Sequence, residues 1–255
     1  ASGYVASFVA PLPVLQKFLK LWGTSAQFGV RNILGSEIEI RGREYLPTAH
    51  PPLIAAKHQS ELDVLVMVSQ HPDMTTVAMR ELTKFPFFGR ILRVLDYVTV
   101  QLSGPPENRT REVIEGARRA HLAGRPVVIY PEGTLMSLGA KERYRAGIWH
   151  IYNDLQIPVT PVAMSLGVIW PRREWVKFPK TRGAFEYLPP IAPGLDREEF
   201  LATLEHQVET ATMRLIEEHA EGDMLSAARD RFARGVANED MPWQSSQHAA
   251  RKKTE

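Results

Sequence analysis

The sequence predicts a single α/β domain with a largely parallel mixed sheet covered by helices on both faces, together with an amphipathic helix at the N-terminus. Short apolar runs, rich in valine, isoleucine or aromatic residues and bounded by turn residues, alternate with segments of helical periodicity. A chain of 255 residues is also long enough to bury one substantial core. Such alternation is typical of a sheet that is buried on both faces.

The individual elements follow from these patterns. The expected strands are 53–56, 75–79, 97–101, 126–130, 159–164 and 184–188. The expected helices are 61–70, 87–95, 108–122, 143–155, 196–219 and 223–234. Asp196 is suited to cap the fifth helix, and Gly124 follows the third where helices commonly end. We assign residues 1–36 to a membrane-associating segment, 37–220 to the α/β domain, and 221–255 to a C-terminal helix and polar tail.

The N-terminal stretch YVASFVAPLPVLQKFLKLW combines apolar residues with Lys17 and Lys20. Pro11 and Pro13 divide it into two short pieces, and the second is an amphipathic helix with Trp22 at its polar margin. Such a helix suits a membrane surface. It is equally typical of a helix packed on its own domain, because the two kinds of apolar stripe look alike.

Composition excludes several classes of site. The chain contains no cysteine, which rules out disulfides, thiolate metal sites and a cysteine nucleophile, and suits a cytoplasmic location. The formal net charge is only +2, so nucleic acid is not an expected partner. No segment reaches the roughly 18–20 apolar residues of a membrane-spanning helix.

The stretch LIAAKHQSELDVLV places His58 at the end of an expected buried strand, where α/β sheets commonly present their sites. With His58 in a loop and Asp63 in the first turn of the next helix, the two side chains can meet. They would form a general base with an orienting carboxylate. The structural alternative is that Ser60 caps the helix and Asp63 completes a capping box.

The stretch RPVVIYPEGTLMSLG ends another expected buried strand in Pro131, Glu132, Gly133 and Thr134. Proline ends strand pairing, and glycine permits a tight turn with accessible backbone N–H groups. Such a turn can hold an anion or position a substrate. By itself, this stretch is better explained as an ordinary loop.

Together, His58-x-x-x-x-Asp63 and Pro131-Glu-Gly-Thr134 resemble the glycerolipid acyltransferase family, which includes 1-acylglycerol-3-phosphate acyltransferases. The resemblance runs from about Ile38 to Glu218 and includes RGREYLP, FPFFGR, YRAG, IPVTPVAMSLG, WPRR and YLPPIAPGLDREEF. In that family the histidine deprotonates the acceptor hydroxyl, which attacks an acyl thioester directly, and the aspartate orients the histidine.

The resemblance therefore implies that His58 is the catalytic base and Asp63 its orienting partner, with no metal and no cofactor. The substrate-binding residues that it implies are Arg80, Gly89, Glu132, Gly133, Thr134 and Pro161. The implied reaction is acyl transfer from acyl-CoA or acyl carrier protein to a lysophospholipid, first of all 1-acylglycerol-3-phosphate, in phospholipid biosynthesis. The implied location is peripheral, at the cytoplasmic face of the membrane.

Three positions depart from the family pattern. Met79, Gln101 (or Leu102) and Leu135 stand where the family has cations that hold the acceptor's phosphate, and neither methionine nor leucine makes charge-assisted bonds to phosphate. Either nearby cations substitute, or the acceptor lacks a phosphomonoester, as a lyso-ornithine lipid does. The candidate substitutes are Arg80, Lys84, Arg90, Lys141, Arg143 and Arg145.

Two rival functions remain. AMSLG around Ser165 resembles the nucleophile elbow of a serine hydrolase but lacks its first glycine, as LMSLG (135–139) does. A non-catalytic lipid-binding protein with the same fold is the second. The segment 170–183 interleaves aromatic residues with cations, among them Arg172, and suits an anionic membrane, the phosphates of CoA or an acidic carrier protein.

Overall fold

The computed structural model describes residues 12–79, 83–84, 86–100, 106–172 and 178–235. Its centre is a seven-stranded sheet with the order β1-β7-β6-β2-β5-β3-β4. The strands are β1 (Glu37–Arg41), β2 (Leu53–Ala56), β3 (Thr75–Met79), β4 (Val98–Val100), β5 (Val127–Ile129), β6 (Val159–Met164) and β7 (Arg182–Tyr187). Only the β6–β7 pair within this sheet is antiparallel. The predicted α/β fold with a largely parallel mixed sheet is confirmed.

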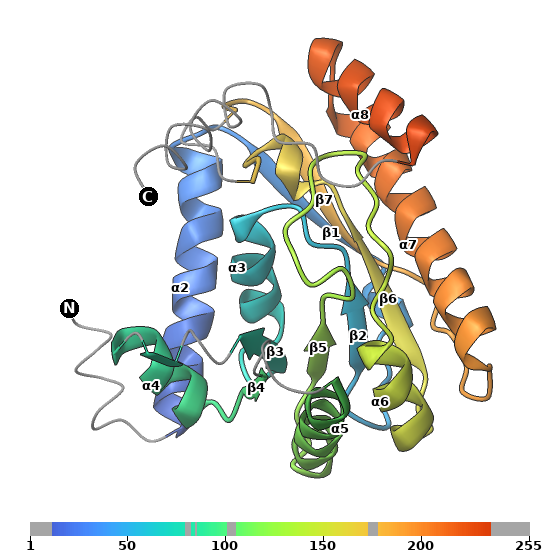
Figure 1. Cartoon of the computed structure of the whole chain (residues 1–255). Coiled ribbons are helices and arrows are strands. Elements are labelled where there is room, and N and C mark those ends of the chain that lie inside the picture. The colour runs from blue at the N-terminus through green and yellow to red at the C-terminus, as the bar shows by residue number, and fades with distance from the viewer. Residues whose placement is uncertain (1–11, 80–82, 85, 101–105, 173–177, 236–255) are drawn as a thin grey trace, which may run out of the picture.

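Helices cover both faces of the sheet, as Figure 1 shows. One face is covered by α2 (Leu12–Asn32) and α3 (Glu61–Gln70), and the other by α5 (Pro106–Leu122), α6 (Gly147–Leu155) and α7 (Arg197–His219). The remaining helices are α4 (Pro86–Val94), α8 (Gly222–Arg234) and the short 3-10 turns η1 (Arg43–Tyr45) and η3 (Leu166–Val168).

Strand periodicity decides which core each side chain joins, because successive residues of a strand point to opposite faces. In β2, Ile54 and Ala56 pack with α2 and α3, whereas Leu53 and Ala55 pack with α5, α6 and α7. All four residues are fully buried, so β2 lies at the centre of the sheet. The residue after each central strand is thereby directed to a particular layer of helices.

Two elements differ from the expectation. Strand β1 was not predicted, because charged residues alternate with isoleucine in EIEIR. It lies at the edge of the sheet, where one face of a strand can stay hydrated. Helix α6 begins at Gly147 instead of residue 143, because the preceding residues belong to a long loop that follows β5. The expected C-terminal helix is present as α8, and the expected polar tail lies outside the described residues.

Helix α2 presents apolar residues on two sides. It starts at Leu12 with Pro13 in the first turn, where proline is tolerated. The side against α3 contains the buried residues Leu15, Leu19 and Val30. The opposite side contains Val14, Leu21 and Phe28, which are 49%, 64% and 66% exposed and recur every seven residues. The N-terminal helix is thus packed on the domain and also exposes a second apolar stripe.

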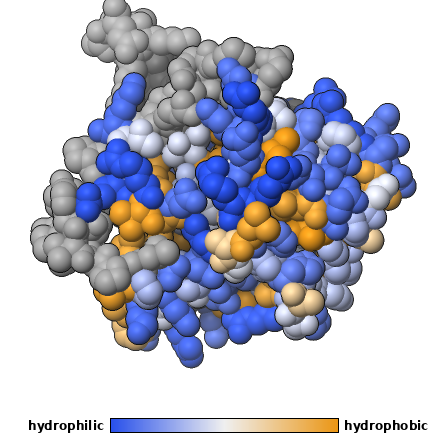
Figure 2. Space-filling model, turned by 90° about the horizontal axis from the view of Figure 1, so that it is seen from below, coloured by the Kyte–Doolittle hydropathy of each residue, from blue (hydrophilic) through white to orange (hydrophobic). Residues whose placement is uncertain are grey.

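Within the described ranges, no helix combines the length and apolar character needed to cross a bilayer. On the face of the molecule seen from below, hydrophilic residues predominate and apolar side chains form separate patches (Figure 2).

Candidate active site

Parallel pairing brings the two sequence stretches together. Strands β2 and β5 are adjacent and parallel, so the residues that follow them emerge at the same edge of the sheet. The backbone N–H of His58 donates to Glu132 Oε2 at 2.9 Å, and the N–H of Met136 donates to the carbonyl of His58 at 2.6 Å. The loop after β5 therefore holds both sides of the His58 backbone.

His58 and Asp63 are in contact, with Nδ1 of the imidazole 3.1 Å from Asp63 Oδ2. The same oxygen accepts the backbone N–H groups of Gln59 and Ser60 at 2.6 and 2.8 Å. Asp63 Oδ2 already accepts two N–H groups and also accepts from the ring, so in the neutral imidazole the hydrogen is on Nδ1 and the lone pair is on Nε2. The capping box at Ser60 is also present, and the two interpretations of Asp63 hold together.

Tyr130, the residue after β5, fixes the plane of the imidazole. Its ring stacks on that of His58 with the centroids 4.2 Å apart and the planes 27° apart. Burial, with the nearby Asp63 carboxylate second, raises the pKa of Tyr130 well above 10, so the phenol stays neutral. The His58 side chain retains 17% exposure, so the imidazole is not sealed inside the protein. This contact was not predicted, because it depends on the register between β2 and β5.

A second polar group lies beneath the histidine, on the opposite face of the sheet. Lys57 is fully buried, with Nζ 2.5 Å from Glu132 Oε1 and 2.8 and 2.9 Å from the two oxygens of Glu209 on α7. Tyr144 donates its hydroxyl to Glu209 Oε1 at 2.9 Å, and the carbonyl of Ala140 lies 3.2 Å from Nζ. We call Lys57, Glu132, Glu209 and Tyr144 the buried ion cluster.

The charges of the buried ion cluster shift the pKa values of its members. Burial lowers the pKa of Lys57, but Glu132 and Glu209 outweigh that effect, so its pKa is raised overall. Burial raises the pKa of Glu132 to about 7, with Lys57 opposing the shift and Glu209 adding to it. The cluster was not predicted, although a lysine directly after the apolar run LIAA and a glutamate on the apolar side of α7 were signals of it.

The turn after β5 has an inner and an outer side. Glu132 is fully buried and turned inward, so it can serve a substrate only by shaping the turn, whereas Gly133 is exposed and Thr134 half-buried. Gly133 has φ +68°, and a Cβ built on it would lie 2.6 Å from the guanidinium carbon of Arg145. Arg145 is exposed, and its backbone N–H donates to Pro131 at 2.9 Å. An arginine therefore lies across the outer side of the turn.

The other predicted binding residues lie elsewhere. Gly89 is on α4, where a Cβ would overlap the carbonyl of Thr83, so a glycine is needed for packing. Pro161 lies within β6, paired with Ala55 of β2. Arg80 lies outside the described residues. The structure thus brings His58 into contact with Asp63 and Glu132, with Gly133 and Thr134 next in the same turn, whereas the contacts of Gly89 and Pro161 are those of helix packing and strand pairing.

Ser165 does not have the surroundings of a hydrolase nucleophile. It is fully buried after β6, and its Oγ accepts the backbone N–H of Ala184 at 2.9 Å. His219 Nδ1 is 3.1 Å from this oxygen and 2.7 Å from the carbonyl of Leu215. A nitrogen bonded to a carbonyl must carry a hydrogen, so it cannot take a proton from Ser165.

Arg172 corrects the expectation for segment 170–183. It was grouped with surface cations, but it is 6% exposed and donates to the carbonyl of Leu135 at 2.7 Å. Arg172 therefore braces the loop after β5 and is not available to a membrane. Residues 173–177 lie outside the described part of the chain, and Phe178, Lys180 and Arg182 are exposed.

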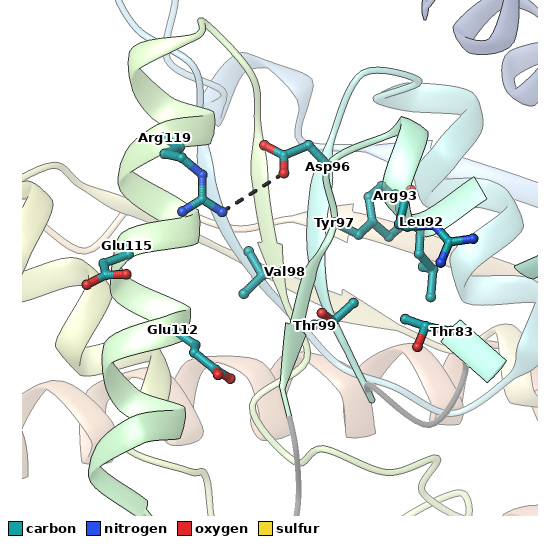
Figure 3. Close-up of a pocket in the computed structure, with 10 residues that line it drawn as sticks. All are labelled: Thr83, Leu92, Arg93, Asp96, Tyr97, Val98, Thr99, Glu112, Glu115 and Arg119. Atoms are coloured by element: carbon teal, nitrogen blue, oxygen red, sulfur yellow. Dashed lines mark ion pairs between the residues drawn. The ribbon is translucent and has the colours of Figure 1, made fainter. Parts of the chain in front are cut away.

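A separate pocket of about 320 Å³ lies at the edge strand β4 (Figure 3). Its lining includes Asp96 and Arg119, whose charged groups are 3.9 Å apart, and residues from the start of β4. His58 instead follows the carboxyl end of β2, which β5 and β3 separate from β4. The pocket is therefore distinct from the His58 site. Among the described residues, no group of three or more His, Asp or Glu side chains is arranged to hold a metal ion.

Comparisons with known proteins identify the family and relatives of the chain. Residues 37–165 match the family model described as "Acyltransferase". A 1-acyl-sn-glycerol-3-phosphate acyltransferase of Pseudomonas aeruginosa is 29% identical over 183 residues, which cover 70% of each chain. The alpha form of that enzyme from Ovis aries is 25% identical over 64% of this chain, and the match spans 56% of the relative's length.

The crystal structure of PlsC, the 1-acyl-sn-glycerophosphate acyltransferase from Thermotoga maritima, has a similar fold, with a TM-score of 0.67. The match covers 84% of this chain and 86% of that one, at 22% sequence identity.

Replacing Glu132 with glutamine tests the charge state of the buried ion cluster. Between pH 4.5 and about 7 the folded protein keeps a proton on Glu132 that the unfolded chain has released, so this group lowers the free energy of unfolding as the pH rises through that window. Near pH 6, the slope of that free energy against pH should be more positive in Glu132→Gln than in the wild type, by up to about 1.4 kcal/mol per pH unit. Urea titrations at a series of pH values measure it.

Glu44→Gln is the matched control, because Glu44 is exposed in η1. Its slope near pH 6 should equal that of the wild type. Equal slopes in all three proteins would mean that Glu132 titrates as an ordinary carboxyl group.

Proposed function

Because the chain belongs to the acyltransferase family, we propose that it is a lysolipid O-acyltransferase that converts 1-acylglycerol-3-phosphate to phosphatidic acid. The observation that carries the proposal is the His58–Asp63 pair, in which Nδ1 is bound to the carboxylate and the His58 side chain keeps 17% exposure. The names of the relatives from Pseudomonas aeruginosa and Ovis aries support this choice of acceptor. The acyl donor is acyl-CoA or acyl carrier protein.

The proposed chemistry is one direct transfer. His58 Nε2 takes the proton of the acceptor hydroxyl as that oxygen attacks the thioester carbonyl, and the hydrogen bond from Nδ1 to Asp63 stabilises the imidazolium. The C–S bond then breaks, and the proton passes from His58 to the departing thiolate. Tyr130 and the backbone bonds of His58 keep the base fixed, so little reorganisation accompanies the reaction.

Arg145 is the proposed contact for the acceptor's phosphate. Its guanidinium lies against Gly133, and Gly133 follows Glu132, which accepts the backbone N–H of His58. A planar guanidinium can form two parallel bonds to a phosphate, which suits it to replace the family arginine absent at Leu135. Lys141, another candidate, is occupied over the ring of Phe232 at 3.7 Å. If Arg145 does not serve the phosphate, a lysolipid without a phosphomonoester, such as a lyso-ornithine lipid, becomes the better acceptor.

The exposed stripe of α2 is the proposed membrane contact, at the cytoplasmic face. Val14, Leu21 and Phe28 share one side of the helix, with Trp22, Lys17 and Lys20 beside them. Apolar side chains flanked by cations and tryptophan suit a bilayer with anionic lipids. This arrangement would hold the protein peripherally, next to a lipid acceptor.

The first test is acyl transfer with acyl-CoA or acyl carrier protein and a panel of lysolipids. We expect kcat to fall by about 10²- to 10⁴-fold in His58→Ala, and strongly in Asp63→Asn, because the base or its tautomer is lost. His121→Ala, at the end of α5, is the matched control and should retain activity. Transfer that persists in His58→Ala would remove His58 from the role of base. A wild type that acylates no lysolipid would favour the non-catalytic lipid-binding protein.

A second test concerns the acceptor head group. Arg145→Met should raise KM for 1-acylglycerol-3-phosphate by about 10-fold or more, because a charge-assisted bond is lost. KM for the acyl donor should not change. Arg143→Met is the control, two residues away and also exposed. Unchanged KM in Arg145→Met, or an equal rise of KM in Arg143→Met, would contradict the specific assignment of the phosphate to Arg145.

Flotation with vesicles containing anionic lipid tests the membrane contact. Replacing Leu21 and Phe28 with serine should weaken binding by about 10-fold or more, since each exposed side chain contributes on the order of 1.5 kcal/mol or more when buried. The control is Leu122→Ser, at the end of α5, where the leucine is 79% exposed. Unchanged binding in the double variant would locate the membrane contact elsewhere.

A further inference from the structure

Glu209 lies well outside the segment that matches the family, residues 37–165, yet it contacts a residue next to the base. Its carboxylate is on α7, in a side chain only 5% exposed, and both oxygens receive the ammonium of Lys57. Lys57 in turn contacts Glu132, which accepts the backbone N–H of His58. A continuous line of polar contacts therefore runs from α7 to the histidine.

We propose that Lys57 and Glu209 are positioning residues that hold Glu132 and, through it, the backbone of His58, so that helix α7 is part of the catalytic unit. The proposal rests on the proposed function of His58 as the base. It assigns no contact with substrate to either residue, because both side chains are buried.

Strand geometry explains why the lysine reaches α7. Ala55 faces the layer of α5, α6 and α7, and Lys57, two residues later, points the same way, while His58 points to the α3 side with Ala56. The ammonium donates to the carboxylate of Glu209 and to the carbonyl of Ala140, and it forms an ion pair with Glu132. A buried ammonium is tolerated only with such partners, so its position is tightly specified.

Glu132 passes this constraint to the base. Its Oε1 faces Lys57 while its Oε2 accepts from His58, and the two oxygens belong to one rigid planar group. A shift of Lys57 therefore turns the carboxylate and displaces the His58 backbone. Misplacement of a catalytic group by about 1 Å can cost about 10²-fold in rate.

The charge of Glu209 predicts a second measurable effect, on the pH dependence of kcat. The groups that face Glu132 are Lys57, Glu209, Tyr144 and the backbone of His58, with Glu205 of α7 and Asp63 nearby. If Glu132 were protonated, the hydrogen on one of its oxygens would oppose either the Lys57 ammonium or the His58 N–H. Only the ionised carboxylate therefore accepts from both. Because Glu209 adds to the raised pKa of Glu132, removing its charge should move the acid limb of the kcat profile to lower pH.

The experiment compares Glu209→Gln with Glu217→Gln. Glu217 is on the same helix but forms an exposed ion pair with Arg229, 2.8 Å away. We expect kcat of Glu209→Gln to fall by about 10- to 100-fold with KM for both substrates unchanged, and its acid limb to shift down. The exchange of the His58 backbone amide, measured by NMR, should become faster. Glu217→Gln should match the wild type in all these respects.

Two outcomes separate the proposals. Suppose that the wild type transfers acyl groups and that Glu209→Gln has the same kcat, pH profile and amide exchange. This result overturns the positioning role and leaves the proposed function intact. If the wild type transfers no acyl group, the proposed function fails and amide exchange alone decides: faster exchange supports the link from α7, and equal exchange overturns it. If Glu209→Gln does not fold, Tyr144→Phe removes one donor to Glu209 and is judged by the same measurements, with a smaller decrease expected.

Discussion

An ammonium group without access to water must be paired with carboxylates, and Lys57 meets this requirement with residues from two distant parts of the chain. Glu132 comes from the loop after β5, and Glu209 comes from α7, 152 positions further along the chain than Lys57. Leaving either ion unpaired in the interior would cost several kcal/mol. The requirement thus ties a central strand, the loop that holds the histidine backbone and a late helix into one arrangement.

The site itself is a consequence of parallel pairing combined with strand periodicity. Two adjacent strands end at the same edge, and alternation sends Lys57 to one layer of helices and His58 to the other. His58 and the rest of the buried ion cluster therefore lie on opposite sides of the sheet, yet both contact Glu132. One carboxylate satisfies an ion on one face and a backbone N–H at the end of the strand.

Local patterns predicted much of this molecule. Six strands and the main helices followed from apolar periodicity, and the cap at Ser60 followed from its residue type. The contact between His58 and Asp63 was also predictable, because it needs only five residues of chain. Strand β1 was missed because its charges are typical of surface, and an edge strand has one exposed side.

Contacts that depend on tertiary register could not be predicted. The stacking of Tyr130 on His58, the pairing of Lys57 with Glu209 and the burial of Arg172 each join elements that are distant in sequence or in different layers. Arg172 illustrates the limit, because a buried cation that bonds to a carbonyl and a surface cation have the same sequence signature. The family model matches residues 37–165, which do not include α7, so it gives no indication that this helix contacts the site.

The two bonds that hold the His58 backbone determine which positions of the loop after β5 can vary. The loop after β5 holds the histidine through one carboxylate and one main-chain N–H, that of Met136. Any residue other than proline would supply the second bond, and the side chains of residues 133–135 take no part in either. Substitutions at Thr134 and Leu135 can therefore alter the outer side of this turn without removing either bond to His58, whereas Gly133 is constrained by its positive φ and by the guanidinium of Arg145 beside it.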